Sequence, residues 1–260
     1  MNQQFIVYWL GYHQNPPKIQ LLPKGIDVVN LFLLNLATSS GGTTLDYTYI
    51  TSSGVSWTDI LSQAQAARAN GVKVCVSIIP PNATLIWNTI PDPTTFALNV
   101  YNLVTSWKLD GIDIDPEQGV GVIPNATFTK VVQALGKYFG PSSTTGLRMT
   151  FASYQLSSDK SLLSQTHALF DAVTLMGYFW SYNTMISQFK DYASVVGSEN
   201  LLFGIGGDPW STSYEETIQL AKWQPSAGSK GGMMEFNIDD DPSYKFANGI
   251  IGVIKPEGAA

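Results

Sequence analysis

The sequence predicts a single (β/α)8 TIM barrel over residues 1–260, and three observations support this prediction. The chain is long enough for one large core, and nothing in its composition divides it into two domains. Short runs of β-forming residues recur along its whole length, and the segments between them can form helices. The order strand, helix, strand, helix gives a parallel sheet, and eight such units close that sheet into a barrel.

Each strand is predicted from its own apolar, β-branched run. In chain order, the eight strands are expected at residues 5–10, 27–36, 72–79, 109–115, 147–153, 170–178, 200–206 and 232–238. Helices are expected between them, most clearly at 57–68 and 94–107. In these two segments apolar residues recur at helical spacing, and Ser56 and Asp92 are the expected N-caps.

Other connections look less helical. The segments after the first and fifth strands contain loop-like runs at 15–17 and 157–159, followed only by short apolar turns. Stretches rich in Gly, Ser and Thr at 39–44 and 142–146 indicate surface loops, not linkers between domains.

Charge and composition limit the classes of ligand. With 14 Lys+Arg against 20 Asp+Glu, the net charge is −6, which argues against nucleic acid and anionic membranes as partners. An aromatic content of 12% suits carbohydrate, because sugar rings present apolar faces that stack on aromatic rings. The chain starts directly with a strand-like run and contains no signal-like or membrane-spanning stretch, so its location stays open between an unsecreted protein and one whose signal is absent. We expect a monomer.

The most informative segment is the strand 109–117. Side chains alternate along a strand, so Asp113, Asp115 and Glu117 share one face while the two isoleucines between them take the other. Active sites of (β/α)8 barrels lie at the carboxyl ends of the strands, where these acids are expected. Crowded carboxylates cannot all ionise, so a pKa must rise and keep one acid protonated as a proton donor. A calcium loop would interleave its acids with Gly and polar residues.

The run Asp110-Gly111-Ile112-Asp113-Ile114-Asp115-Pro116-Glu117 resembles the signature of glycoside hydrolase family 18, the chitinases and endo-β-N-acetylglucosaminidases. The resemblance implies substrate assistance, in which the acetamido oxygen of the sugar attacks the anomeric carbon and an oxazolinium ion forms with retention. It implies that Glu117 protonates the leaving oxygen and later activates water. Asp115 would hold the acetamido group, Asp113 would share a proton with Asp115, and Asp110 would support the entry to the strand.

Other strands resemble the family in part. Met176-Gly177-Tyr178 is similar to its Met-x-Tyr-Asp segment, which implies that Met176 contacts substrate and that Tyr178 donates to the acetamido carbonyl, although Phe179 replaces the acid. Phe236 stands where the family has a tryptophan floor under the sugar, and residues 77–80 keep the serine of Ser-x-Gly-Gly but have Ile79 and Pro80 instead of both glycines. The chain is too short for the insertion domain of some family chitinases, so residues 1–260 are expected to form one family-18-like catalytic barrel.

Further aromatic residues are candidate substrate contacts. Tyr8 on the first strand looks like a family counterpart, with barrel packing as the alternative. Trp9, Trp180 and Trp210 lie at or just after strand ends, where each could stack on a sugar.

No metal or cofactor is expected. Asp239-Asp240-Asp241 suits a solvated loop that caps the next helix better than it suits a metal site. The single Cys75 and the isolated His13 and His167 form no metal or triad pattern and are interpreted as structural or surface residues.

Three functions fit this barrel. The first is a chitinase that cleaves β-1,4-linked N-acetylglucosamine, the second an endo-β-N-acetylglucosaminidase acting on the chitobiose core of N-glycans, and the third a lectin-like barrel that binds without cleaving. The retained Glu117 favours catalysis. The segment 176–178 resembles the chitinases and 236–239 the endoglycosidases, and chitin is the expected substrate.

Overall fold

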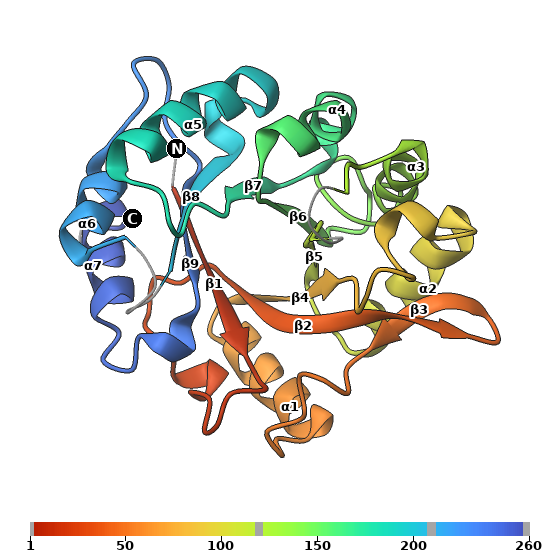
Figure 1. Cartoon of the computed structure of the whole chain (residues 1–260). Helices are drawn as coiled ribbons and strands as arrows, with labels where there is room; N and C mark the ends of the chain where they lie inside the picture. Colours follow the sequence, from red (N-terminus) through yellow and green to blue (C-terminus); the bar gives the residue numbers. More distant parts are fainter. Residues whose placement is uncertain (1–2, 118–121, 207–211, 257–260) are drawn as a thin grey trace.

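The computed structural model describes residues 3–117, 122–206 and 212–256 and confirms the TIM barrel. Eight parallel strands surround one axis, and the sheet closes because the first strand pairs with both the second and the last (Figure 1). All eight predicted strands are present: β1 (Gln4–Leu10), β2 (Val28–Ser39), β4 (Lys73–Ile79), β5 (Gly111–Ile114), β6 (Arg148–Ser153), β7 (Ala172–Leu175), β8 (Leu201–Gly206) and β9 (Gly232–Phe236).

Helices form a ring outside the strands (Figure 1). They are α1 (Trp57–Ala69), α2 (Pro93–Ser106), α3 (Ala126–Leu135), α4 (Leu156–Thr166), α5 (Tyr182–Val196), α6 (Tyr214–Lys222) and α7 (Lys245–Ile254), with short 3-10 turns η1 (Ile19–Leu21), η2 (Trp87–Thr89), η3 (His167–Leu169), η4 (Ser198–Asn200) and η5 (Ile238–Asp240). Both expected caps are confirmed, since Ser56 accepts from the amide of Asp59 and Asp92 accepts from the amides of Thr94 and Thr95.

Two expectations about the connections were wrong. The stretch 39–44 is the tip of a hairpin, because β2 runs on to Ser39 and pairs antiparallel with an additional strand, β3 (Gly42–Asp46). The side-chain amide of Asn99 on α2 donates to the carbonyl of Thr43 at 3.0 Å and ties this hairpin to the helix layer. The loop-like run 157–159 lies in the first turns of α4, where Asp159 accepts a hydrogen bond from Ser153 and anchors the helix to β6.

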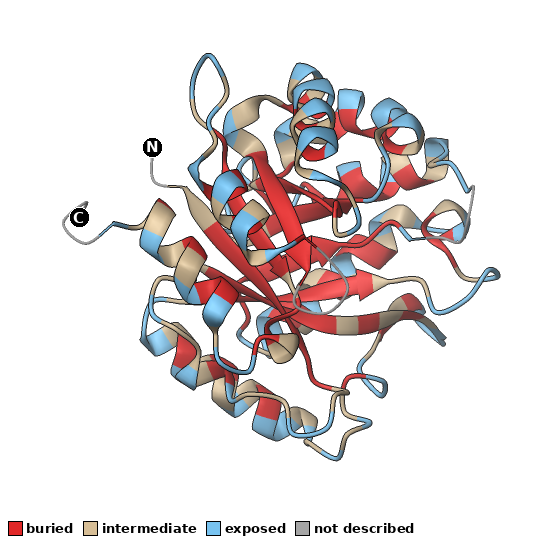
Figure 2. Cartoon of the chain, turned by 60° about the vertical axis from the view of Figure 1, so that its left-hand side comes forward, coloured by how far each residue is buried: buried red, intermediate tan, exposed pale blue. Residues whose placement is uncertain are grey.

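The barrel has two apolar cores, separated by the strands. On β1, Phe5 and Val7 face the helices, whereas Ile6 and Leu10 face the barrel interior. Buried residues follow the strands and the inner faces of the helices, and exposed residues cover the outer faces (Figure 2). Both faces of the strands are buried, and the alternation of side chains between the two cores fixes which side chains of each strand can reach the barrel mouth.

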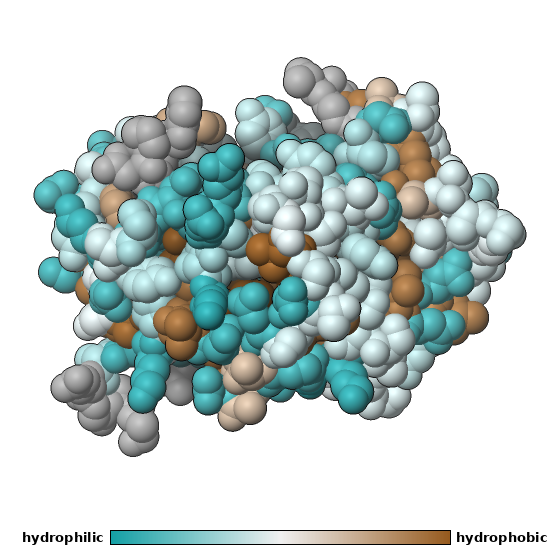
Figure 3. Space-filling model, turned by 90° about the horizontal axis from the view of Figure 1, so that it is seen from below, coloured by the Kyte–Doolittle hydropathy of each residue, from teal (hydrophilic) through white to brown (hydrophobic). Residues whose placement is uncertain are grey.

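The face of the molecule seen from below is mainly polar (Figure 3). Seen from below, hydrophilic side chains predominate and hydrophobic ones form small separate groups (Figure 3). Within the described ranges, every helix is too short or too polar to traverse a lipid bilayer.

Glu235 is a buried carboxyl outside the barrel mouth. Glu235 on β9 is fully buried, and its neighbours Met234 and Phe236 face the interior, so Glu235 faces the helices. Neither of its carboxylate oxygens has a hydrogen-bond partner among the described residues. Burial, and next the charge of Asp241, raise the pKa of Glu235 well above its ordinary value.

A carboxyl whose pKa is raised by folding destabilises the fold as pH rises from its unfolded pKa toward its folded pKa. We therefore expect Glu235→Gln to increase the free energy of unfolding at pH 8 by about 1–3 kcal/mol and to have little effect near pH 4. Urea unfolding at both pH values measures this difference, with the exposed Glu199→Gln as control. A variant that is less stable than wild type at pH 8 would contradict the assignment of Glu235 as an uncompensated buried acid.

Candidate active site

Three carboxyls lie one above another at the carboxyl end of β5. Asp113 is fully buried, Asp115 is 4% exposed, and Glu117 is exposed at the surface of the mouth. The strand places them this way because Ile112 and Ile114 face the helix core while the acids face the interior. The predicted grouping of the three acids on one face agrees with these positions.

Asp113 is held by hydroxyls from three other strands. Its carboxylate accepts hydrogen bonds from Tyr8 (2.8 Å), Ser77 (2.7 Å) and Thr150 (2.5 Å). Burial raises the pKa of Asp113 in spite of these donors. The Asp113 carboxyl, which lies below Asp115, is therefore fixed in place, and it binds a proton more readily than an exposed aspartate does.

Asp115 is positioned through both its main chain and its side chain. The indole N–H of the buried Trp87 donates to the Asp115 carbonyl at 2.7 Å, and the amide of Glu117 donates to its Oδ1 at 3.1 Å. Burial raises the pKa of Asp115 well above its ordinary value, and the charge of Glu117 is the next cause. Ionising Asp115 and Glu117 together is therefore unfavourable.

Glu117 is the only one of the three acids whose side chain reaches the open mouth. The surrounding protein partly excludes water from the Glu117 carboxyl, and this desolvation raises its pKa above the ordinary value for glutamate. A raised pKa and access to the mouth are the two properties that a general acid needs.

Aromatic rings pack together beside the acids. Tyr178 stacks on Phe236 with ring centroids 5.3 Å apart and planes at 22°, and Phe236 also contacts Tyr8 at 5.6 Å. After burial, the charges of Asp115 and Glu117 are the next causes that raise the pKa of Tyr178, so its hydroxyl lies near both acids. Tyr8 lies below this level, because its hydroxyl is bound to Asp113 and its side chain is buried.

The remaining candidate contacts differ in position. Met176 is buried at the end of β7, and its amide donates to the carbonyl of Ser153. Trp180 is partly buried against the core between barrel and helices. Contact of either residue with substrate stays a prediction, and Trp210 lies outside the described residues. The expectation for Trp9 was wrong, since it is fully buried on the helix side of β1 and donates to the Pro17 carbonyl.

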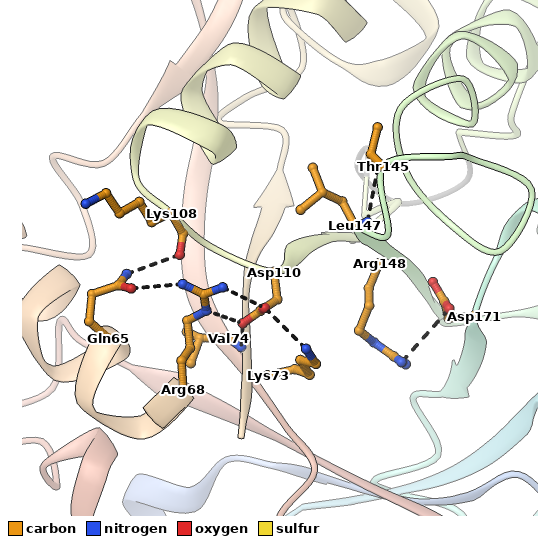
Figure 4. Close-up of polar contacts among 10 residues, drawn as sticks. All are labelled: Gln65, Arg68, Lys73, Val74, Lys108, Asp110, Thr145, Leu147, Arg148 and Asp171. Carbon is orange, nitrogen blue, oxygen red and sulfur yellow. Dashed lines mark hydrogen bonds and ion pairs between the residues drawn. The ribbon is translucent and has the colours of Figure 1, made fainter. Parts of the chain in front are cut away.

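Asp110 lies at the opposite end of β5 from the three acids. It forms ion pairs with Arg68 (2.7 Å) and Lys73 (3.6 Å) and accepts from the amide of Val74 (Figure 4). These contacts join α1, β4 and the start of β5 at the bottom of the barrel. Asp110 therefore supports the entry to the strand, as expected.

Two positioning residues escaped the sequence analysis. Thr150 bonds Asp113 from β6, and its inward alternation on that strand was the available signal. Trp87 comes from the connection after β4 and had no such signal, because its contact with Asp115 depends on how that connection folds back.

The described residues contain no group of three or more His, Cys, Asp or Glu placed to hold a metal ion. Asp241 accepts from the amides of Lys245 and Ala247 at the start of α7, so the run Asp239-Asp240-Asp241 does contact the next helix as expected. The expectation of a solvated loop was wrong, because Asp241 is buried and Asp239 accepts from the amide of Leu10 on β1.

Comparison with models of known protein families identifies the family of this chain. The family model described as the TIM-barrel domain of endo-β-N-acetylglucosaminidase EndoS matches residues 7–235. The chain belongs to this family. It is thus a family-18 barrel of the chitinase and endo-β-N-acetylglucosaminidase type.

Individual proteins are similar to this chain in sequence or in fold. Endo-β-N-acetylglucosaminidase F2 of Elizabethkingia meningoseptica is 28% identical over 170 residues, which are 60% of this chain and only 50% of that protein. The structure of an endo-β-N-acetylglucosaminidase from Cordyceps militaris has a TM-score of 0.74 at 23% identity, covering 98% of this chain and 92% of that one. A family GH18 chitinase from Chromobacterium violaceum has a TM-score of 0.74 at 14% identity, covering 98% and 84%.

Proposed function

We propose that this protein hydrolyses the β-1,4 linkage between two N-acetylglucosamine units, with retention and with assistance from the substrate. The observation that carries the proposal is the order of the acids in the mouth, with Glu117 accessible above the buried Asp115 and Asp113. Only the outermost acid can meet a glycosidic oxygen, and the acids below it are suited to stabilise charge.

In the first step the acetamido oxygen attacks the anomeric carbon while the bond from that carbon to the leaving oxygen breaks. Glu117 gives its proton to the leaving oxygen, and an oxazolinium ion remains. In the second step Glu117, now a carboxylate, takes a proton from water, and the water oxygen bonds to the anomeric carbon and reopens the ring.

The other residues orient the acetamido group. Asp115 accepts from its N–H and stabilises the positive charge of the oxazolinium ion. Asp113, fixed by three hydroxyls, lies beneath and shares a proton with Asp115. Tyr178 donates to the acetamido carbonyl, and Phe236 provides an apolar floor for the sugar ring.

The chitobiose core of an N-glycan is the favoured location of this linkage. The family model and the Elizabethkingia relative are both named for endo-β-N-acetylglucosaminidases. Chitin, the expectation from sequence, is the second candidate, supported by the resemblance of segment 176–178 to the chitinases. A lectin-like role is disfavoured because a binding protein gains nothing from crowded buried acids.

The substrate class can be tested by incubating the protein with chitohexaose and, separately, with a high-mannose glycopeptide. Mass spectrometry of the products shows which is cut, and a glycopeptide that retains one N-acetylglucosamine identifies cleavage within the chitobiose core. Failure to cut either substrate, under conditions where the fold is intact by circular dichroism, would overturn the proposed hydrolase activity.

The pH dependence of kcat/KM should follow the protonation of the Glu117 carboxyl. Its pKa is raised above the ordinary value, and it must be protonated for the first step, so kcat/KM should be sustained on the acidic side of neutral pH. As pH rises through the Glu117 pKa, kcat/KM should fall with the loss of one proton. Steady-state rates at several pH values measure this profile, and activity that keeps rising to pH 9 would contradict the assignment of Glu117 as the acid.

A further inference from the structure

Asp159 is a buried carboxyl that joins three elements of the fold. It lies in the first turn of α4, and its Oδ2 accepts a hydrogen bond at 2.5 Å from the hydroxyl of Ser153 at the end of β6. The Ser153 oxygen lies 2.7 Å from the hydroxyl oxygen of the buried Tyr192 on α5. We propose that Asp159 is a further residue of the cleavage machinery, which touches no substrate but stabilises, with its fixed carboxylate, the positive charge that develops beside Asp115. The inference rests on the proposed function and adds a residue to it.

Two hydroxyls in series hold the Asp159 carboxylate. Ser153 has one proton and donates it to Asp159, so Tyr192 must be the donor to Ser153. These contacts favour the ionised carboxyl, but burial has the larger effect and raises the pKa of Asp159 to about 6. Asp159 is therefore charged at neutral pH and becomes neutral as the pH falls below its pKa.

The Asp159 carboxylate lies on the side of the site where Asp115 is found. β5 and β6 are neighbouring parallel strands, and Asp115 follows the end of the first while Ser153 ends the second. The charge of Asp159 contributes to the raised pKa of Asp115, whereas burial is the cause that raises the pKa of Glu117. Asp159 is thus closer in its electrostatic effect to Asp115 than to Glu117.

No lysine or arginine of the described ranges forms an ion pair with Asp159. Its helix packs against α3 and α5 (Figure 1). The titratable side chains on and beside these elements, β5 and β6 are Asp113, Asp115, Glu117, Lys130, Arg148, Tyr154, Lys160, His167, Tyr182, Lys190, Asp191 and Tyr192. The lysines among them are exposed, and Asp115 and Tyr192 are the groups whose pKa the charge of Asp159 raises. The negative charge is therefore not neutralised on the side that faces the site.

The first chemical step separates charge in the direction that Asp159 favours. Glu117 becomes a carboxylate when it gives its proton to the leaving oxygen, and the oxazolinium ring becomes positive beside Asp115. Because Asp159 acts more strongly at Asp115 than at Glu117, it attracts the new positive charge more than it repels the new negative one. A buried charge exerts this effect with little screening by salt.

The pH dependence of kcat in Asp159→Asn tests this role. Asparagine keeps an oxygen that can accept from Ser153 but carries no charge, and the protonation of Glu117 is common to both proteins. On the glycan that the wild type cleaves, the ratio of the variant kcat to the wild-type kcat should be near one below about pH 5. It should fall to about one third to one tenth above about pH 7, where wild-type Asp159 is ionised.

Ser153→Ala provides a second variant that keeps the carboxyl. The Ser153 hydrogen bond lowers the pKa of Asp159, so without it the charge should appear at higher pH. The kcat of Ser153→Ala should therefore be lower than that of wild type between the two pKa values and recover at higher pH. This variant decides the proposal if circular dichroism shows that Asp159→Asn does not fold.

Asp191→Asn is the matched control, because it removes the same charge from an exposed position on α5. It should leave kcat unchanged at every pH. A loss in Asp159→Asn of the same factor at all pH values would show a merely structural role, and no loss at any pH would show no role. Either result would overturn the inference and leave the proposed function intact. If the wild-type protein cleaves no glycan, both proposals fall together.

Discussion

Glu117→Gln is expected to lower kcat on a glycan with an ordinary sugar leaving group by about 10²- to 10⁴-fold, because the leaving oxygen then departs without a proton. Glutamine keeps the size and polarity of the side chain but cannot donate an acidic proton. The Glu117 side chain is exposed, so the variant should fold as the wild type does. Stopped assays that follow product by mass spectrometry give the rate.

Leaving-group dependence provides the internal control for Glu117. An aryl glycoside with an acidic phenol needs little protonation, so the loss in Glu117→Gln should be much smaller on that substrate. Asp110→Asn is the matched carboxylate control, since Asp110 belongs to the same run but pairs with Arg68 at the bottom of the barrel. It should lower stability and leave kcat near that of wild type. An unchanged kcat in Glu117→Gln on the sugar leaving group would remove Glu117 from the mechanism.

Asp115→Asn should also cause a large loss, about 10²- to 10³-fold in kcat, for a different reason. Asp115 is proposed to stabilise the charge of the oxazolinium ion, which forms whatever group leaves. The loss should therefore be similar for aryl and sugar leaving groups. Steady-state kinetics on both substrate types distinguish the two acids.

A structural role for Asp115 would give another pattern. Asp115 is buried, so the free energy of unfolding of Asp115→Asn should be measured in parallel by urea titration. A loss of activity that depended on the leaving group as it does for Glu117→Gln would contradict the role assigned to Asp115. So would a loss explained entirely by unfolded protein.

The barrel could be predicted because its strongest signals are local. Each of the eight strands is an apolar run, and alternation along 109–117 places three acids on one face without knowledge of the rest of the fold. The motif at Glu117 and the strand entry at Asp110 followed from the same segment.

Features that depend on contacts distant in sequence were not predictable. Trp9 follows Tyr8 directly and so takes the opposite face, but which face is interior depends on closure against β2 and β9. The hairpin of β3 came from a polar run that looked like a loop, because an exposed edge strand needs few apolar residues. Trp87 reaches the Asp115 carbonyl from 28 residues away, and no spacing rule indicates that contact.

The most direct test of the central claim is the configuration of the first product, followed by proton NMR while the wild-type protein cleaves the substrate it accepts. Substrate assistance with Glu117 as acid and then base predicts that the new reducing end appears first as the β-anomer and only later equilibrates. The signal should be absent with Glu117→Gln over the same interval. An α-anomer formed first, or the same β signal at the same rate in the variant, would contradict the mechanism.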